Sequence, residues 1–241
     1  MILTENHYTG TSGYSYAYWK NRFYPEGWPA AKQLQYYATQ FNTVELNHTF
    51  YRFPVIKSLA KAADAVPDDF RFSVKMNKVV THTQRMHGVK DKVADFMALV
   101  QEGLGVKLAC VLFQLPPSFS FTPERLDDIL QNIPSEPGMV IEFRHLSWWD
   151  ETVFKALRNA GITFCAVSFP GLPDLNVVTT DLFYKRMHGV PELFKSAYDA
   201  RDLDPLANFV KKRNPGFVYF NNTMYKAGYT NALTLKEQLE G

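Results

Sequence analysis

Residues 139–149 read MVIEFRHLSWW, a stretch that begins as a buried strand and ends in charged and aromatic residues. Ile141 and Phe143 suit a strand inside a protein core. Glu142 and Arg144 alternate with them, and a charged side chain that is buried without a partner costs several kcal/mol. The carboxyl end of this segment therefore indicates a place where polar groups meet.

The same change from apolar to polar residues recurs along the chain and predicts eight strands. These runs are 7–13, 43–51, 70–76, 108–115, 139–145, 162–168, 182–188 and 217–222. Between them, apolar residues at three-and-four spacing predict amphipathic helices in the ranges 30–41, 55–66, 93–104, 125–133, 151–160, 203–213 and 232–239. The exception is 169–181, FPGLPDLNVVTTD, because its proline and glycine content does not suit an ordinary helix.

The alternation of strand and helix through 241 residues, without a low-complexity linker, predicts an α/β fold. The length suits a (β/α)8 TIM barrel in which residues 1–241 form a single domain. We expect an irregular or reduced crossover between strands six and seven. A doubly wound open sheet is the alternative, but the G-x-G-x-x-G motif is absent after the first strand.

The composition excludes two classes of protein. With 26 Lys and Arg against 24 Asp and Glu, and 46% apolar residues, the chain is neither disordered nor a generic polyelectrolyte binder. Cys110 and Cys165 lie in apolar runs without the spacing of a zinc site or a disulfide framework, which indicates core thiols in a reducing cytosol. The N-terminus, MILTENHYTG, lacks the features of a signal peptide, and no apolar run is long enough to span a membrane. We therefore expect a cytoplasmic protein without a membrane partner.

Alternation along the strands assigns polar side chains to the barrel interior. Because helix-facing positions must be apolar, the residues that alternate with them along each strand point into the barrel. The inward polar residues expected near the carboxyl ends are Ser12, Glu45, Asn47, Ser73, Lys75, Gln114, Glu142, Arg144, Ser168, Arg186, His188 and Asn221. TIM-barrel enzymes place their active sites at this end, which predicts a functional site there. The alternative is a polar plug, in which Glu45 and Glu142 are neutralised by the neighbouring cations.

Aromatic residues concentrate in the loops expected at the same end. Segment 13–28, GYSYAYWKNRFYPEGW, interleaves aromatic rings with cationic residues, and its Tyr14 and Trp19 are candidate ligand contacts. Aromatic rings beside cations stack bases in proteins that bind single strands. The structural alternative is a hydrophobic lid over the barrel. His82 and His87, in the connection after strand three, suit either a mobile flap or an ordinary surface position.

Six segments together resemble one known family. They are GTSGYSYAYW, FNTVELNHTFYR, CVLFQLPPSF, IEFRHLSWW, YKRMHG and YFNNT, in this order along nearly the whole chain. The chain thereby resembles the YecE-like barrel family, also called domain of unknown function 72. The resemblance implies a TIM barrel but no reaction, and it marks Glu45, Asn47, Lys75, His82, Gln114, Glu142, Arg144, His145, Arg186, His188, Asn221 and Asn222. One departure is Ser168, because many relatives carry an aspartate there.

The charges expected at the barrel mouth favour an anionic ligand. Lys75, Arg144 and Arg186 outnumber Glu45 and Glu142, which suits a phosphate-bearing small molecule held by arginine. A distant likeness of such barrels to the endonuclease IV and xylose isomerase group implies a phosphate or nucleic-acid theme. The main hypothesis is an enzyme with the catalytic residues Glu142, His188, Lys75 and Glu45 and the substrate-binding residues Arg144, Arg186, Asn47, Gln114, Asn221, Asn222, His82, His145, Tyr14 and Trp19.

Each charged group has an expected role in that enzyme. Arg144 and Arg186 hold the anion, while Glu142 acts as general base or acid. His188 exchanges a proton and can add a further positive charge. Lys75 forms an ion pair with a glutamate or, with a depressed pKa, a Schiff base with a carbonyl substrate.

Two other functions remain open. One is a nucleic-acid-binding module or nuclease, in which the aromatic loops stack bases around a cationic mouth. The other is a glycosidase that uses Glu45 and Glu142. We predict no cofactor and no metal site because HExxH and a histidine cluster at the strand ends are absent, although the sequence leaves a divalent metal open. The sequence sets no oligomeric state.

Overall fold

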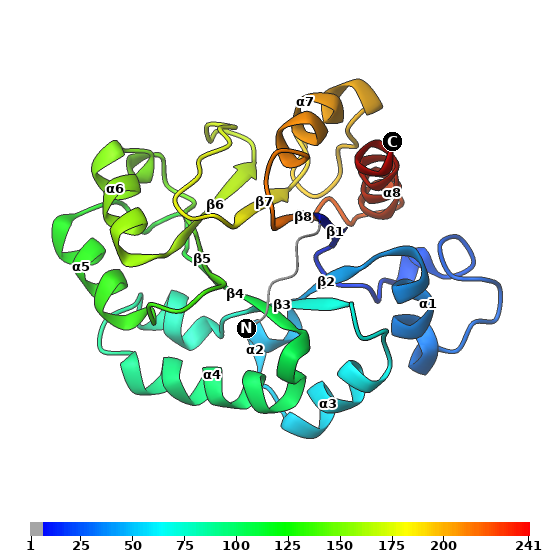
Figure 1. Cartoon of the computed structure of the whole chain (residues 1–241), viewed down its shortest axis with the longest axis horizontal. Coiled ribbons are helices and arrows are strands. Elements are labelled where there is room, and N and C mark those ends of the chain that lie inside the picture. The colour runs from blue at the N-terminus through cyan, green and yellow to red at the C-terminus, as the bar shows by residue number, and fades with distance from the viewer. Residues whose placement is uncertain (1–6) are drawn as a thin grey trace.

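The computed structural model describes residues 7–241, and strands and helices alternate along them (Figure 1). The strands are β1 (His7–Thr11), β2 (Thr43–Leu46), β3 (Arg71–Lys75), β4 (Leu108–Gln114), β5 (Met139–Glu142), β6 (Thr163–Ser168), β7 (Phe183–Met187) and β8 (Gly216–Phe220). The helices are α1 (Gln33–Gln40), α2 (His48–Tyr51), α3 (Ile56–Asp64), α4 (Lys90–Leu104), α5 (Pro123–Asn132), α6 (Glu151–Ala160), α7 (Ala200–Val210) and α8 (Ala227–Glu240). Residues 1–6, part of the stretch from which we predict that a signal peptide is absent, lie outside the described residues.

Neighbouring strands pair in parallel, in the order β1-β8-β7-β6-β5-β4-β3-β2. The two ends of this order meet at a bridge between Ser12 and Glu45, where the Gly13 N–H donates to the Glu45 carbonyl at 2.8 Å. The close approach requires glycine at Gly10, because a Cβ atom there would collide with the Thr43 carbonyl. The strands form a nearly closed barrel with helices outside it (Figure 1). The predicted TIM-barrel fold is confirmed, and the open sheet is wrong.

The crossover between β6 and β7 lacks a helix, as the composition of 169–181 predicts. A cavity of about 430 Å³ lies beside the two strands, and Ser168, Lys185 and Tyr198 are among its lining residues. Lys185 is 4% exposed, and its ammonium donates to Asn176 at 2.7 Å. This cavity belongs to the irregular crossover and lies outside the barrel interior.

Ser168 faces this outer cavity, so its predicted inward position is wrong. Cys165 and Val167 belong to the interior cluster, and Ser168 follows Val167 directly. Side chains alternate faces along a strand, which places Ser168 on the helix side. The segment ITFCAVS is apolar on both faces, so its alternation carries no signal that would have set the parity.

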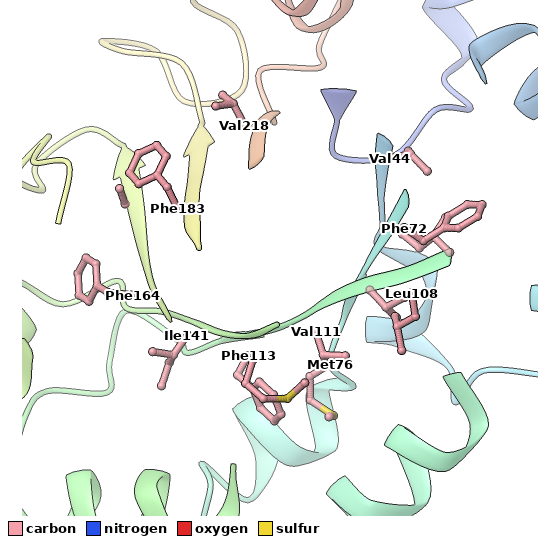
Figure 2. Packing of buried hydrophobic residues seen from close by; sticks show 14 of the residues in the cluster. Val44, Phe72, Met76, Leu108, Val111, Phe113, Ile141, Phe164, Phe183 and Val218 are labelled. Carbon is pink, nitrogen blue, oxygen red and sulfur yellow. The ribbon is translucent and has the colours of Figure 1, made fainter. Parts of the chain in front are cut away.

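The helix-facing sides of the strands form the larger of two apolar clusters. Figure 2 shows Val111, Phe113 and Ile141 pointing from the strands toward the surrounding helices. All three residues are 0% exposed, and burial of each such side chain stabilises the fold by roughly 1.5–3 kcal/mol.

Among the helices of residues 7–241, none combines the length and the apolarity needed to cross a membrane.

A smaller apolar cluster fills the barrel interior. It contains Cys110 and Cys165 together with the aromatic rings of Tyr8, Tyr184 and Tyr219. Both cysteines are free and buried, which matches the predicted core thiols. Burial raises the pKa of each thiol, so neither forms a thiolate readily.

Candidate functional site

Arg186 of β7 is a buried bridge between two carboxylates from distant strands. Its Nη1 donates to Glu142 Oε2 at 2.6 Å, and its Nη2 donates to Glu45 Oε1 at 2.7 Å. Arg186 is 1% exposed and both glutamates are 0% exposed. Although burial lowers the pKa of Arg186, the two carboxylates outweigh it and the net direction is upward. Arg186 therefore stays charged, and its terminal nitrogens hold protein carboxylates, which is the arrangement that the polar-plug alternative predicts for this residue.

Glu142 is held in its ionised form by two arginines. The Arg144 Nε donates to Glu142 Oε1, the oxygen that Arg186 leaves free. Burial alone would raise the pKa of Glu142, but the charges of Arg144 and Arg186 hold it well below the ordinary value of 4.5. A general acid needs a raised pKa, so this arrangement opposes an acid role for Glu142.

Glu45 is saturated by hydrogen-bond donors. Ser12 Oγ donates to Glu45 Oε1 at 2.8 Å, and Tyr184 Oη donates to Glu45 Oε2 at 2.7 Å. With Arg186, three donors meet one carboxylate; Ser12 directly follows β1, and Tyr184 and Arg186 both belong to β7. A buried carboxylate must be both paired and hydrogen-bonded to be tolerated. Glu45 therefore holds the network together beneath the mouth.

His188 is a buried neutral imidazole beside the arginines. Its Nε2 lies 3.1 Å from Arg144 Nη2 and 3.5 Å from Glu142 Oε1, and its Nδ1 lies 2.9 Å from the Asn221 side-chain amide. Burial, followed by the charge of Arg144, lowers the pKa of His188 to about 3. This lowered pKa opposes the expectation that His188 adds a positive charge, because protonation would place a third buried cation beside Arg144 and Arg186.

Lys75 is the cation of the mouth that has no carboxylate partner. Its Nζ donates to Gln114 Oε1 at 2.7 Å and lies 4.2 Å from the centroid of the Phe50 ring. Within residues 7–241, no carboxylate oxygen lies within 4.0 Å of this ammonium. Burial, followed by the charge of Arg186, lowers the pKa of Lys75 to about 8. Lys75 is thus charged near neutral pH but lacks a counter-ion.

Aromatic rings lie against both Lys75 and Arg144. The guanidinium carbon of Arg144 lies 4.2 Å from the centroid of the Phe169 ring, and Phe169 meets the His188 ring edge-on at 5.5 Å. His82 packs edge-on against Phe50 at 4.9 Å. Burial and then Lys75 lower the pKa of His82 to about 4, so it adds no charge near neutral pH. Sequence reasoning missed Phe169, because its only signal is its place directly after strand six.

Two predicted ligand contacts line a separate hollow between the loops after β1 and β2. Tyr14 and Asn47 lie in the wall of a cavity of about 300 Å³. The Oδ1 atom of Asn47 is buried and has no hydrogen-bond partner among residues 7–241. The structure therefore places these two residues together, at the rim of the mouth.

Three other predicted contacts have structural partners instead. Trp19 is 0% exposed and its Nε1 donates to the Tyr225 carbonyl at 2.9 Å, so it presents no face to a ligand. Asn222 is buried, and its Nδ2 donates to the Ser196 carbonyl at 2.9 Å. His145 accepts a hydrogen bond from the Ser147 N–H, which caps a short 3₁₀ helix.

Two further findings concern the remaining candidates for metal or flap chemistry. His87 is exposed, and its Nδ1 lies 3.1 Å from Asp128 Oδ2, so it occupies the ordinary surface position that we considered. Among the described residues, no group of three or more His, Cys, Asp or Glu side chains could hold a metal ion.

Comparisons with known proteins identify sequence relatives of this barrel. The family described as "Protein of unknown function DUF72" matches residues 8–241. The chain is 27% identical over 137 residues to the UPF0759 protein YecE of Escherichia coli K12, and 28% identical over 139 residues to the UPF0759 protein YunF of Bacillus subtilis. These matches cover 54% and 55% of this chain and 49% of each relative, so the chain spans about half the length of the curated relatives it matches.

Two solved structures share the fold over almost the full chain. A DUF72 family protein from Thermotoga maritima has a TM-score of 0.88 and 31% identity, covering 98% of this chain and 99% of that one. A DUF72 family protein from Enterococcus faecalis has a TM-score of 0.81 and 20% identity, covering 98% of this chain and 96% of that one. The resemblance identified from the sequence motifs is confirmed.

Proposed function

The chain belongs to the DUF72 family, and because that family's description assigns no reaction, we propose a function from the site alone: the barrel mouth binds a small anionic molecule that carries a phosphate group. Lys75 and Arg144 are the residues that contact the anion. Arg186 acts beneath them by holding the carboxylates.

The observation that carries this proposal is the missing counter-ion of Lys75. Glu45 and Glu142 neutralise the charge of Arg186, and Arg144 also forms an ion pair with Glu142. Neither carboxylate is within ion-pair distance of Lys75. Cations at partly buried sites are normally paired, since an unpaired charge costs free energy. An anion from solution would supply the partner that the protein lacks.

The available donors suit a phosphate. The ammonium of Lys75 has three donors, and Gln114 accepts one of them. The guanidinium of Arg144 is planar, and its side chain is 8% exposed beside the Phe169 ring. A phosphate accepts several charge-assisted hydrogen bonds at once, so it satisfies both cations where a neutral molecule would not.

If the site transfers a proton, we propose that Lys75 carries it. Of the four predicted catalytic groups, Glu142 is held ionised, Glu45 accepts bonds from three donors and His188 is neutral with a pKa of about 3. Lys75, with a pKa of about 8, is the group that can both hold and release a proton near neutral pH. The glycosidase alternative loses support because one guanidinium binds both of its carboxylates.

Isothermal titration with ribose 5-phosphate and with inorganic phosphate tests the proposal. Replacing Lys75 by Gln removes the charge and keeps a polar side chain, and we expect it to weaken binding by about ten- to a hundredfold, the value of a charge-assisted hydrogen bond. The matched control is Lys57→Gln, since Lys57 is an exposed lysine of α3. Absence of binding by the wild type, or equal affinity in Lys75→Gln and wild type, would refute the assignment.

A further inference from the structure

We infer that the ligand of the mouth is a mononucleotide, with its phosphate on Lys75 and Arg144 and its base on an aromatic platform formed by Phe194 and Tyr225. This inference rests on the proposed anion site and names the class of molecule that the site takes. Phe194 lies in the loop after β7, and Tyr225 lies in the loop after β8.

Both rings leave apolar surface in water. Phe194 is 41% exposed and Tyr225 is 57% exposed. Tyr18, from the loop after β1, is 43% exposed, and its ring centroid lies 5.8 Å from that of Tyr225. Single exposed rings are common, but these three come from three loops at the carboxyl end of the barrel, around a cationic mouth.

The backbone of both platform residues is in the left-handed region. Phe194 has φ of 66° and Tyr225 has φ of 61°. Bulky residues rarely adopt this conformation because the Cβ atom crowds the backbone. Such conformations persist where the surrounding structure enforces them, and they gather at ligand-binding sites.

Hydrogen bonds hold the backbone of both platform residues. The Phe194 N–H donates to the His188 carbonyl at 2.7 Å, and the Met224 N–H donates to the Phe194 carbonyl at 3.1 Å. The Trp19 Nε1 donates to the Tyr225 carbonyl at 2.9 Å. The backbone that carries the two rings is therefore held in place before a ligand arrives, which lowers the entropy that binding would cost.

The platform adjoins the anion site. His188 Nε2 lies 3.1 Å from Arg144 Nη2, and the His188 ring centroid lies 6.4 Å from that of Phe194. One imidazole is thus a neighbour of both the phosphate contact and the nearest platform ring. A mononucleotide has the matching layout, because one sugar separates its phosphate from its base. Aromatic side chains stack any of the bases, since every base has a π face.

Titration of the whole protein with adenosine monophosphate and ribose 5-phosphate tests the inference. Stacking of one base predicts that adenosine monophosphate binds about tenfold or more tightly than ribose 5-phosphate. Phe194→Leu should remove most of this advantage and leave the affinity for ribose 5-phosphate unchanged. Tyr225→Leu should act in the same direction and supplies the test if Phe194→Leu does not fold. The matched control is Phe53→Leu, since Phe53 is 40% exposed and lines a cavity beside α4 that none of the proposed ligand contacts lines.

The outcomes separate this inference from the proposal beneath it. If ribose 5-phosphate does not bind at all, the anion site itself fails. If both ligands bind equally and the leucine variants change nothing, the platform is refuted while the anion site stands. If a short single-stranded thymidine oligonucleotide binds far more tightly than the mononucleotide, and steeply less with added salt, a nucleic-acid strand replaces the mononucleotide as the ligand.

Discussion

Lys75→Met should make the unliganded protein more stable at pH 7. The pKa of Lys75 is lowered from an ordinary value of 10.5 to about 8, a difference that corresponds to about 3 kcal/mol against the charged form in the folded state. Methionine removes the charge but also the hydrogen bond to Gln114 and the contact with the Phe50 ring, which together offset about 1–2 kcal/mol. We therefore expect the free energy of unfolding to rise by about 1–2 kcal/mol.

The pH dependence isolates the charge from the change of shape. Between pH 8 and pH 10.5 the unfolded chain binds a proton on Lys75 that the folded chain has released. Stability of the wild type therefore rises with pH in this window, and the advantage of Lys75→Met should vanish near its upper end. Urea unfolding of both proteins at pH 7 and near pH 10 measures the two differences.

Two results would refute this reasoning. A loss of stability in Lys75→Met at pH 7 would mean that the ammonium has a stabilising partner. An advantage that persists unchanged near pH 10 would mean that it comes from packing instead of charge. Lys57→Met, at an exposed lysine of α3, is the control and should stay within about 0.5 kcal/mol of the wild type at both pH values.

Three further predictions follow from the buried network and the platform. Arg186→Met leaves Glu45 and Glu142 buried without their shared counter-ion, so urea unfolding should show a loss of about 3–5 kcal/mol; a loss below about 1 kcal/mol would contradict the bridge. Because the pKa of Glu142 is depressed in the folded protein, ionised Glu142 stabilises the fold above its unfolded-state pKa, and this contribution is lost as the pH falls below that pKa. Glu142→Gln should therefore lose less stability than the wild type between pH 5 and pH 3. Parallel losses in the two proteins would argue against a depressed pKa. Tyr225→Gly should be more stable than Tyr225→Ala by about 1 kcal/mol in thermal unfolding, since glycine lacks the Cβ atom that strains the backbone at φ of 61°. Equal stabilities would show that the backbone is unstrained.

Local patterns were sufficient to predict the barrel and most of its polar interior. Glu45 and Glu142 each alternate with apolar neighbours, so their inward direction is readable from the strand period alone. Ser168 shows where this fails, because a strand that is apolar on both faces contains no alternation. The resemblance to the family was also readable from the sequence, since the motifs that carry it are short segments at the carboxyl ends of the strands.

Aromatic loops were harder to interpret from the sequence. Trp19 and Tyr225 both belong to aromatic segments of the loops, yet Trp19 is 0% exposed while Tyr225 is 57% exposed. A hydrogen bond between residues 206 positions apart joins them, from the buried Trp19 ring to the backbone carbonyl of Tyr225. No local pattern reports such a contact.

By itself, the sequence determined the alternation of strands and helices, the missing crossover helix and the direction of most polar side chains. These features depend on steric periods of two and about 3.6 residues, which act between near neighbours. The tertiary structure decided which charges are paired, because Arg186 meets Glu45 and Glu142 only once β2, β5 and β7 close around one axis. That closure leaves Lys75 without a carboxylate, and the excess positive charge at the mouth is therefore a property of the fold.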